Sequence, residues 1–467
     1  MKPVLLIDFG STYTKLTAVD AEGETLLGTA QAFTTIFTDI GDGLKEAMDK
    51  LEAKTGPIQY AETYACSSAA GGLRMVTSGL VPELTGEAAR LASLGAGAKV
   101  VGIYAFQLTE DDLEEIRDLR PDIFLLVGGT DGGNTENILH NARMLAQMQG
   151  DFPVIIAGNR TAARECQRIL SGYETYICPN VMPKFGVLQI EPTQKQIREL
   201  FLNRIIQAKG LSKAAALLSD IMMPTPSAVL QAMDLLAQGC EGETGIGDLI
   251  AVDVGGATTD VYSIADGMPE KMNTVYKGLP EPYSKRTVEG DIGMRYSIQG
   301  IVDAAGISKI ARLSGLTPKR VEELVAMLRE NTSLVPNGDP ELEMLDYALA
   351  CGAVAEAVTR HAGTMEETYT MMGLTFVQSG KDLTNVKQIV VTGGSLIHTV
   401  KTHEIAAHTL YSPAQPGSLR PKAADVWVDR SYILAAMGLL SSHYPAAALR
   451  IMKKELEHHG YSEQKNP

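Results

Sequence analysis

Several features that mark familiar protein classes are missing from this sequence of 467 residues. Its five cysteines are scattered and include no Cys-x-x-Cys pair, a pattern that favours reduced thiols in a cytoplasm over a zinc site or a disulfide framework. No apolar run approaches the roughly 20 residues that a membrane-spanning helix requires. No basic run is longer than Lys453-Lys454 and the formal net charge is −15, which argues against a nucleic-acid-binding face. We therefore expect a cytoplasmic protein that binds neither membranes nor nucleic acid.

The length of the chain predicts more than one domain. A chain of 467 residues is too long for a single hydrophobic core, and 45 glycines are typical of many tight turns between strands and helices. A polar segment at 239–245 separates two strand-rich blocks, and we place a domain boundary there. The predicted organisation is a first domain at 1–240, a second domain at 246–429 with a helical subdomain at about 297–372, a returning helix within 430–459 that packs on the first domain, and a disordered tail at 460–467.

Two short segments, Ile7 to Lys15 and Val252 to Asp260, share one pattern although 245 residues separate them. In each segment an apolar strand ends at an aspartate, a glycine follows within two residues, and a hydroxyl-rich turn leads into a second apolar strand. The pattern predicts a β-hairpin whose glycines allow close approach and whose N–H groups can bind a phosphate. Asp8 and Asp253 are candidate catalytic residues and candidate ligands of Mg²⁺, which proteins hold through carboxylates, water and phosphates. The candidate phosphate ligands are Gly10, Ser11, Thr12, Lys15, Gly255, Gly256, Thr258 and Thr259, with Lys15 either reaching a phosphate or closing its hairpin.

A third segment, Gln388 to Ser395, is an apolar strand that runs into a Gly-Gly-Ser turn and the start of a helix. Such a helix start can accept a nucleobase, a ribose or a phosphate at close range. In order and spacing the three segments resemble the phosphate 1, phosphate 2 and adenosine motifs of the superfamily of actin, Hsp70 chaperones and sugar kinases. The resemblance implies an α/β chain with an actin-like ATPase fold, in which two ribonuclease H-like domains form a pseudo-repeat around a nucleotide cleft. It also implies ATP or ADP with Mg²⁺ as cofactors, and Gly393, Gly394, Ser395 and Gly290 as further nucleotide-binding residues.

Two segments around these motifs resemble the connecting helices of the superfamily. Thr225 and Pro226 can start a helix as N-cap and first residue, and the small, apolar run from Tyr432 to Leu440 can form a second helix that returns to the first domain. In Hsp70-like relatives an acid that orients the attacking water precedes the first helix, whereas this chain has Met223. Because a thioether cannot act as a base, we expect slow ATP hydrolysis at most.

A glycine-rich segment, Val127 to Asn134, is similar to the Thr392-Gly393-Gly394-Ser395 turn, and the first and second blocks therefore look like diverged copies of one fold. Asp131 lies on this turn at the end of a strand, where ligands gather in α/β sheets. Asp131 is accordingly a candidate for the missing catalytic acid, and the alternative is that it only shapes the turn.

The combination of Asp8 to Lys15, Cys66 to Leu73, Val127 to Asn134 and Val288 to Gly293 resembles the MutL/GlmL family. These proteins are found beside glutamate mutase and related cobalamin-dependent aminomutases, and they are unrelated to the mismatch-repair protein that shares the name. The resemblance implies an ATP-binding, chaperone-like accessory protein that reactivates or assembles such a mutase through ATP-driven domain movement. The partners would be cobalamin-dependent mutase or aminomutase subunits, and a homodimer remains open.

Two alternative functions use the same fold. A small-molecule kinase would need a catalytic acid facing a hydroxyl substrate, for which Asp131 or Asp291 is available. An actin-like scaffold would form filaments with ATP. A further relative, the activator of 2-hydroxyacyl-CoA dehydratases, carries an iron–sulfur cluster, and the scattered cysteines of this chain do not support one.

Overall fold

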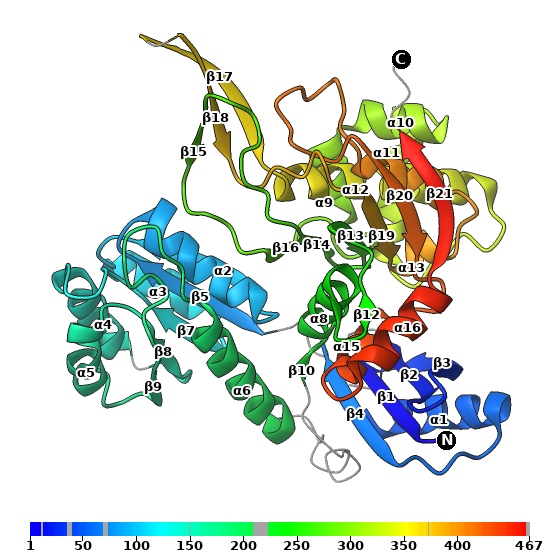
Figure 1. Ribbon diagram of the computed structural model, residues 1–467, viewed down its shortest axis with the longest axis horizontal. Coiled ribbons are helices and arrows are strands. Elements are labelled where there is room, and N and C mark those ends of the chain that lie inside the picture. Colours follow the sequence, from blue (N-terminus) through cyan, green and yellow to red (C-terminus); the bar gives the residue numbers. More distant parts are fainter. Residues whose placement is uncertain are drawn as a thin grey trace. The chain divides into compact units, whose positions relative to one another are not determined.

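The computed structural model describes residues 1–10, 13–34, 40–68, 73–148, 150–208, 223–371 and 373–463. The chain divides into two compact units, whose elements are drawn in Figure 1. Unit 1 comprises Met1–Ala232, Gly278–Pro280 and Ala435–Ala448. Unit 2 comprises Met233–Lys277, Glu281–Leu434 and Leu449–Pro467. The chain therefore first changes unit inside a helix after Ala232, ahead of the polar segment at 239–245.

Unit 1 contains a five-stranded sheet in the order β10-β4-β1-β2-β3, drawn mostly in blue in Figure 1. Strand β2 runs antiparallel to β1 and β3, whereas β4 runs parallel to β1 and β10 runs parallel to β4. Every residue of β1 is buried, as expected for an apolar central strand that is covered on both faces. The strands are β1 (Pro3–Phe9), β2 (Tyr13–Asp20), β3 (Thr25–Phe33), β4 (Glu62–Ser67) and β10 (Met223–Pro224).

A second sheet of unit 1 is entirely parallel and has the order β6-β5-β7-β8-β9. Its central strand β7 is fully buried, and side chains of α3, α4 and α5 join its hydrophobic core. The strands are β5 (Arg74–Gly79), β6 (Lys99–Ala105), β7 (Ile123–Leu126), β8 (Val154–Ile156) and β9 (Thr175–Ile177). The helices of this part of the chain are α1 (Ile40–Thr55), a π-helical turn η1 (Pro82–Gly86), α2 (Glu87–Gly95), α3 (Glu110–Leu119), α4 (Glu136–Met148), α5 (Arg160–Ile169) and α6 (Glu191–Ala208).

Unit 2 contains a six-stranded sheet in the order β16-β14-β13-β19-β20-β21. Strand β14 runs antiparallel to β13 and β16, β19 runs parallel to β13, and β20 runs parallel to β19. Strand β21 completes the sheet by pairing antiparallel with β20. The strands are β13 (Leu249–Val254), β14 (Thr259–Ile264), β16 (Ser284–Glu289), β19 (Gln388–Thr392), β20 (Ala423–Val428) and β21 (Glu457–Glu463).

Five strands of unit 2 repeat the first sheet of unit 1 in order and direction. Strands β3, β2, β1, β4 and β10 correspond in turn to β16, β14, β13, β19 and β20. This duplication is what the resemblance predicted, and it confirms the α/β, actin-like fold built from two ribonuclease H-like domains. One part of the interpretation is wrong, because the counterpart of β19 is β4. Strand β7, which precedes the similar Val127–Thr130 segment, belongs to the other sheet of unit 1.

The helices that cover the sheet of unit 2 surround α12, a long helix rich in small buried residues. Asp339 caps its N-terminus by accepting hydrogen bonds from two backbone N–H groups, and Thr317 caps α11 in the same way through one. Among the described residues, no helix combines the length and apolar character needed to cross a membrane. The helices are α9 (Ile298–Ala305), α10 (Ile307–Ser314), α11 (Pro318–Glu330), α12 (Pro340–His361), α13 (Gly394–Ile397), α14 (Thr402–Ala406) and a short 3₁₀ turn η2 (Ala407–Thr409).

The predicted helical subdomain ends earlier than expected. Helix α12 stops at His361, and the chain continues as the hairpin β17–β18, which with β15 forms a separate three-stranded sheet (Figure 1). Thr364, Thr368 and Thr370 stand an even number of positions apart in β17, which places them on one face of a strand, whereas the helical subdomain was expected to extend to about residue 372. The strands are β15 (Thr274–Lys277), β17 (Thr364–Thr370) and β18 (Gly373–Ser379).

The C-terminal segment also differs from the expectation. Helices α15 and α16 lie within the predicted returning segment, and α15 joins unit 1 from Ala435 onward. Residues 457–463 are strand β21, so the predicted disordered tail is wrong for 460–463, and 464–467 lie outside the described residues. The remaining elements are α8 (Thr225–Gln238), β11 (Gly239–Cys240), β12 (Glu243–Thr244), α15 (Leu434–Ser441) and α16 (Pro445–Glu455).

A buried lysine lies in the interior of unit 2. The Nζ atom of Lys381 donates to the backbone carbonyl of Tyr283 at 2.7 Å. Burial, reinforced by the charge of nearby Lys285, lowers the pKa of Lys381 to about 7. The acids that raise the pKa of Lys381, against the effect of burial, are Glu281, Asp248 and Asp266.

This lowered pKa predicts a pH-dependent stability. Between pH 7 and the ordinary pKa of 10.5, the unfolded chain binds a proton at Lys381 that the folded chain does not bind, so folding stability should rise with pH. Replacing Lys381 by methionine removes this contribution. We expect the melting temperature of the wild type to rise relative to that of Lys381→Met between pH 7 and pH 10, whereas exposed Lys422→Met should show no such trend. If the melting temperatures of Lys381→Met and the wild type changed with pH in the same way, the lowered pKa of Lys381 would be contradicted.

Candidate functional site

The first predicted hairpin is present, with Asp8 at the end of β1 directly opposite Lys15 on β2. The N–H of Gly10 donates to the carbonyl of Tyr13 at 3.0 Å and closes the turn. A Cβ atom at Gly10 would lie 2.6 Å from that carbonyl oxygen, so the turn requires glycine. Gly10 therefore shapes the turn, and its N–H is used within the hairpin. The predicted phosphate ligands Ser11 and Thr12 lie outside the described residues.

The second hairpin has the same construction. Asp253 stands opposite Asp260 across β13 and β14, and the N–H of Gly255 donates to the carbonyl of Thr258 at 2.9 Å. Thr259 was a predicted phosphate ligand, but its side chain is buried and its hydroxyl donates to the carbonyl of Ile292 at 3.0 Å. Thr259 thus anchors the hairpin inside unit 2, because its hydroxyl faces the interior and is already satisfied.

The turn of the second hairpin fits an anion. The backbone N–H groups of Gly256, Ala257 and Thr258 donate to no described residue, and Gly256 and Ala257 are exposed. Three successive N–H groups of this kind form a concave cradle for a phosphate oxygen. The segment that contains Gly290 supports the cradle, because the N–H groups of Arg295 and Tyr296 donate to the carbonyl of Gly256 at 2.8 and 2.9 Å. Gly290 itself only accepts a hydrogen bond from Ser297, at 3.1 Å.

The carboxylate of Asp8 is buried and held on both oxygens. Its Oδ1 accepts a hydrogen bond from the hydroxyl of Thr225 at 2.6 Å and a weaker one from the thiol of Cys66 at 3.5 Å. Burial raises the pKa of the Cys66 thiol, so Cys66 stays protonated and acts as a donor. The Oδ2 atom faces the ammonium of Lys15 at 3.6 Å. Oδ2 is therefore the oxygen that can turn toward a hydrated Mg²⁺, with Lys15 as its counter-ion.

The predicted adenosine turn packs tightly on the second hairpin. Gly393 has a φ of 100°, which favours glycine, and a Cβ atom there would overlap the carbonyl of Val254 and lie 2.9 Å from Oδ1 of Asp253. Gly393 is the N-cap of α13, while Gly394 is exposed and Ser395 is half-buried. The turn after β19 and the turn after β13 thus meet at Asp253 within unit 2.

Asp131 lies elsewhere in unit 1 and is engaged by its own loop. Its Oδ1 accepts hydrogen bonds from the backbone N–H of Arg160 and from the Nδ2 atom of Asn180, both at 3.0 Å. These bonds tie the turn after β7 to the segments after β8 and β9. The geometry favours the turn-shaping alternative over the predicted catalytic role, because one carboxylate oxygen holds three loops together.

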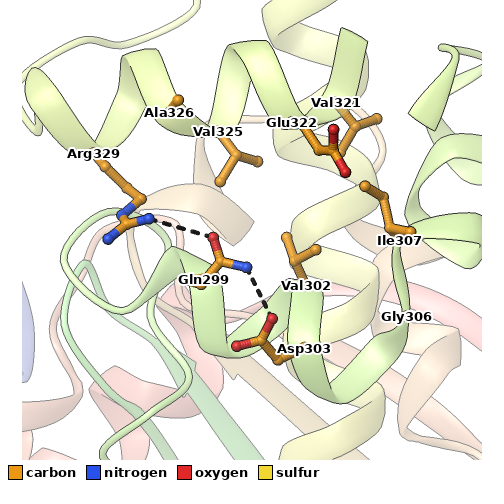
Figure 2. Close-up of a pocket in the computed structure, with 10 residues that line it drawn as sticks. All are labelled: Gln299, Val302, Asp303, Gly306, Ile307, Val321, Glu322, Val325, Ala326 and Arg329. Atoms are coloured by element: carbon orange, nitrogen blue, oxygen red, sulfur yellow. Dashed lines mark hydrogen bonds between the residues drawn. The ribbon is translucent and has the colours of Figure 1, made fainter. Parts of the chain in front are cut away.

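A surface groove of about 490 Å³ lies between α9 and α11 (Figure 2). Its apolar floor is flanked by a hydrogen-bonded chain in which Arg329 donates to Gln299 at 3.5 Å and Gln299 donates to Asp303 at 2.8 Å. Its lining includes none of the residues in the glycine turns. The residues drawn in Figure 2 are Gln299, Val302, Asp303, Gly306, Ile307, Val321, Glu322, Val325, Ala326 and Arg329.

Comparison with known proteins places the chain in a family. A family model described as MutL protein matches residues 4–456. Protein MutL of Clostridium tetanomorphum is 46% identical over 460 residues, which cover 98% of this chain and 99% of that protein. The chain belongs to the MutL protein family. This membership confirms the family resemblance that the motifs indicated.

Solved structures that are similar to this MutL-family chain are distant. The ligand-bound xylulose kinase of Lactobacillus acidophilus is 11% identical, covers 100% of this chain and 94% of its own, and has a TM-score of 0.38. Component A of the (R)-2-hydroxyglutaryl-CoA dehydratase of Acidaminococcus fermentans is 9% identical, covers 96% and 100%, and has a TM-score of 0.32. These scores are too low to add to what the strand order of the two sheets shows.

Sequence reasoning missed one acid at the second hairpin. Asp260 stands opposite Asp253, at the position that Lys15 occupies opposite Asp8. Like charges opposite each other in a sheet are destabilising, and buried Arg286 offsets this by donating to Oδ1 of Asp260 at 2.8 and 2.6 Å. The spacing could have revealed Asp260, because it follows Asp253 by the same seven residues that separate Lys15 from Asp8.

Proposed function

We propose that this MutL-family protein binds Mg²⁺ and ATP through its two glycine turns and acts as an accessory protein of a cobalamin-dependent mutase. The observation that carries the proposal is the duplicated hairpin, in which a carboxylate and a glycine turn close the same strand pair in both units. Family membership supports the mutase as the partner. The nucleotide would be ATP or ADP, since two anion-binding turns suit a polyphosphate.

The residues have distinct roles in this proposal. The N–H groups of Gly256, Ala257 and Thr258 would bind phosphate oxygens, and Lys15 would contribute a positive charge once Asp8 turns to the metal. Asp8 and Asp253 would hold Mg²⁺ through water, and the ion would neutralise phosphate charge. Gly394 and Ser395 would lie against the adenosine.

Slow hydrolysis is part of the proposal. Met223, the first residue of β10, has no group that could activate water, and Asp131 is held in its own loop. Without a general base beside the phosphates, ATP would be hydrolysed slowly and would stay bound. The conformation of the protein would then depend on which nucleotide is bound. ATP and ADP can shift the arrangement of the units only if one arrangement binds one of them better. This supports a chaperone-like accessory role over a small-molecule kinase, which needs a catalytic acid.

The experiment that tests the partner is an affinity capture from the native cytoplasm with the tagged chain in Mg·ATP, Mg·ADP or no nucleotide. We expect a cobalamin-dependent mutase to be retained in one nucleotide state and released in another. Asp253→Ala, expected not to bind nucleotide, should retain the same amount in all three. Equal retention by the wild type in all three states would contradict ATP-driven action on the mutase, and phosphorylation of a metabolite, seen by mass spectrometry, would favour the kinase instead.

A further inference from the structure

The chain changes unit within three helices, α8, α15 and α16, and the first two each follow a corresponding strand of the duplicated sheet. Helix α8 follows β10, and the chain changes unit between Ala232 and Met233. Helix α15 follows β20, and the chain changes unit between Leu434 and Ala435. The two helices therefore start after equivalent strands of the duplicated sheets.

Helix α8 begins on a direct hydrogen bond to the first candidate metal ligand. Thr225, its first residue, donates through Oγ1 to Oδ1 of Asp8 at 2.6 Å, across 217 positions of sequence. A hydroxyl that donates to a carboxylate forms a short, charge-assisted bond, roughly twice as strong as a neutral one. The position of Asp8 is therefore linked to the position of the first turn of α8.

Helix α15 begins on a buried carboxylate that is only 1% exposed. Asp429 accepts hydrogen bonds from the backbone N–H groups of Ile433 at 2.9 Å and Leu434 at 3.2 Å, and thereby caps the helix. Asp429 also accepts a bond from the hydroxyl of Thr392 at 3.2 Å. Thr392 lies beside Asp253 in the parallel register of β13 and β19, so the cap is tied to the second turn.

The strand register makes Asp429 the counterpart of Met223. In unit 1, Met223 pairs with Cys66, which pairs with Asp8. In unit 2, Asp429 follows the last paired residue of β20 and its N–H donates to the carbonyl of Val391, which places it beside Thr392. The position that carries Met223 in unit 1 thus carries an acid, Asp429, in unit 2. There the carboxylate caps helix α15.

We propose that Thr225 and Asp429 are positioning residues that couple nucleotide at the two turns to the crossing helices α8 and α15. The inference rests on the proposed nucleotide site. It adds a way in which nucleotide bound at the turns affects α8 and α15, two of the helices in which the chain passes from one unit to the other. Ligand at Oδ2 of Asp8 fixes that carboxylate, and the bond from Thr225 to Oδ1 then fixes the start of α8. In the same way, ligand at the second turn fixes Thr392 and, through Asp429, the start of α15.

The first test measures hydrogen exchange of α8 with and without Mg·ATP, together with the Mg²⁺ concentration needed for half-maximal ATP binding. In the wild type we expect ATP to slow exchange in α8. Thr225→Val should lose this protection and raise the Mg²⁺ requirement by about tenfold, the value expected for one lost hydrogen bond to a charged group. Thr225→Ser keeps the hydroxyl and should restore both.

A matched control lies on the same turn of the helix. Ser227 is buried, and its hydroxyl has no hydrogen-bond partner among the described residues, so Ser227→Ala should behave as the wild type in both measurements. If Thr225→Val keeps the ATP-dependent protection of α8, or if Thr225→Ser loses it, the coupling through the hydroxyl is contradicted. If the wild type binds no ATP, the proposed function fails, and that result is distinct from a failure of the coupling.

The second test concerns Asp429. Asp429→Ala removes the cap and should abolish ATP-dependent protection of α15 while leaving the Mg²⁺ requirement within about twofold of the wild type, because Thr392, with which Asp429 forms a hydrogen bond, is not a proposed ligand of the metal. Asp429→Asn retains an oxygen that accepts from the N–H groups of Ile433 and Leu434, and it should recover most of the protection. Unchanged ATP-dependent protection in Asp429→Ala would overturn the proposal for α15.

Discussion

Replacing Asp253 by alanine is expected to weaken Mg·ATP binding at least about 100-fold, and Asp8→Ala should do the same. Each change removes a carboxylate that would hold the hydrated metal, and interactions with a charged group of this kind contribute roughly 1.5 to 3 kcal/mol each. Calorimetric titration of the wild type and both variants with Mg·ATP measures the effect. Loss of binding in both variants indicates that nucleotide binding needs both hairpins.

A control variant separates this effect from a general loss of negative charge. Asp266 follows β14 in unit 2 and is exposed, so Asp266→Ala should bind Mg·ATP as the wild type does. Unchanged affinity for Mg·ATP in both Asp8→Ala and Asp253→Ala would mean that neither hairpin takes part in nucleotide binding. Loss in only one of them would limit the site to one unit.

Gly438→Ala should be the most destabilising single substitution among those considered. A Cβ atom at Gly438 of α15 would overlap the carbonyl oxygen of Ala228 in α8, and both residues lie in unit 1. The obstacle is backbone, which cannot turn aside as a flexible side chain can, so a loss of about 2 kcal/mol or more is expected. Thermal unfolding should show a melting temperature several degrees lower, and tight contact between the crossing helices would be the cause.

Gly172→Ala provides the comparison for this prediction. Gly172 is also in unit 1, it is exposed, and a Cβ atom there would meet nothing within 4 Å. We expect its melting temperature to stay within about a degree of the wild type. A Gly438→Ala protein as stable as Gly172→Ala would mean that α8 and α15 do not pack as closely as described.

The duplicated hairpin could be read from the sequence because it is local. The turn and the register are both fixed by three neighbouring features. These are an aspartate at the end of an apolar strand, a glycine two residues later, and a second apolar strand. The buried face of α6 was also predictable, since Ile197, Leu200 and Phe201 recur at helical spacing, and all three are buried.

Other parts of the molecule depend on contacts between distant segments. The counterpart of β19 is β4, whose end reads Cys66-Ser67-Ser68 and lacks the two adjacent glycines that directed attention to Val127–Thr130 instead. Strand β17 lies within the segment that was expected to be helical up to about residue 372, although its pairing with β18, and of β18 with β15, decides its structure.

The same limit applies to the candidate site. The sequence places Thr225 at a helix start, but its bond to Asp8 spans 217 positions and follows only from the pairing of β4 with both β1 and β10. Thr259 has the same hydroxyl as Thr258, and only the fold shows that it points inward to Ile292. Asp429 has no motif around it, and its role emerges when the two sheets are compared strand by strand.

The most direct measurement is an experimental structure of the full chain with Mg²⁺ and a non-hydrolysable ATP analogue. The account predicts a bound triphosphate with phosphate oxygens within hydrogen-bond distance of the N–H groups of Gly256, Ala257 and Thr258. A nucleotide bound away from this turn, or the absence of bound nucleotide at saturating concentration, would contradict it.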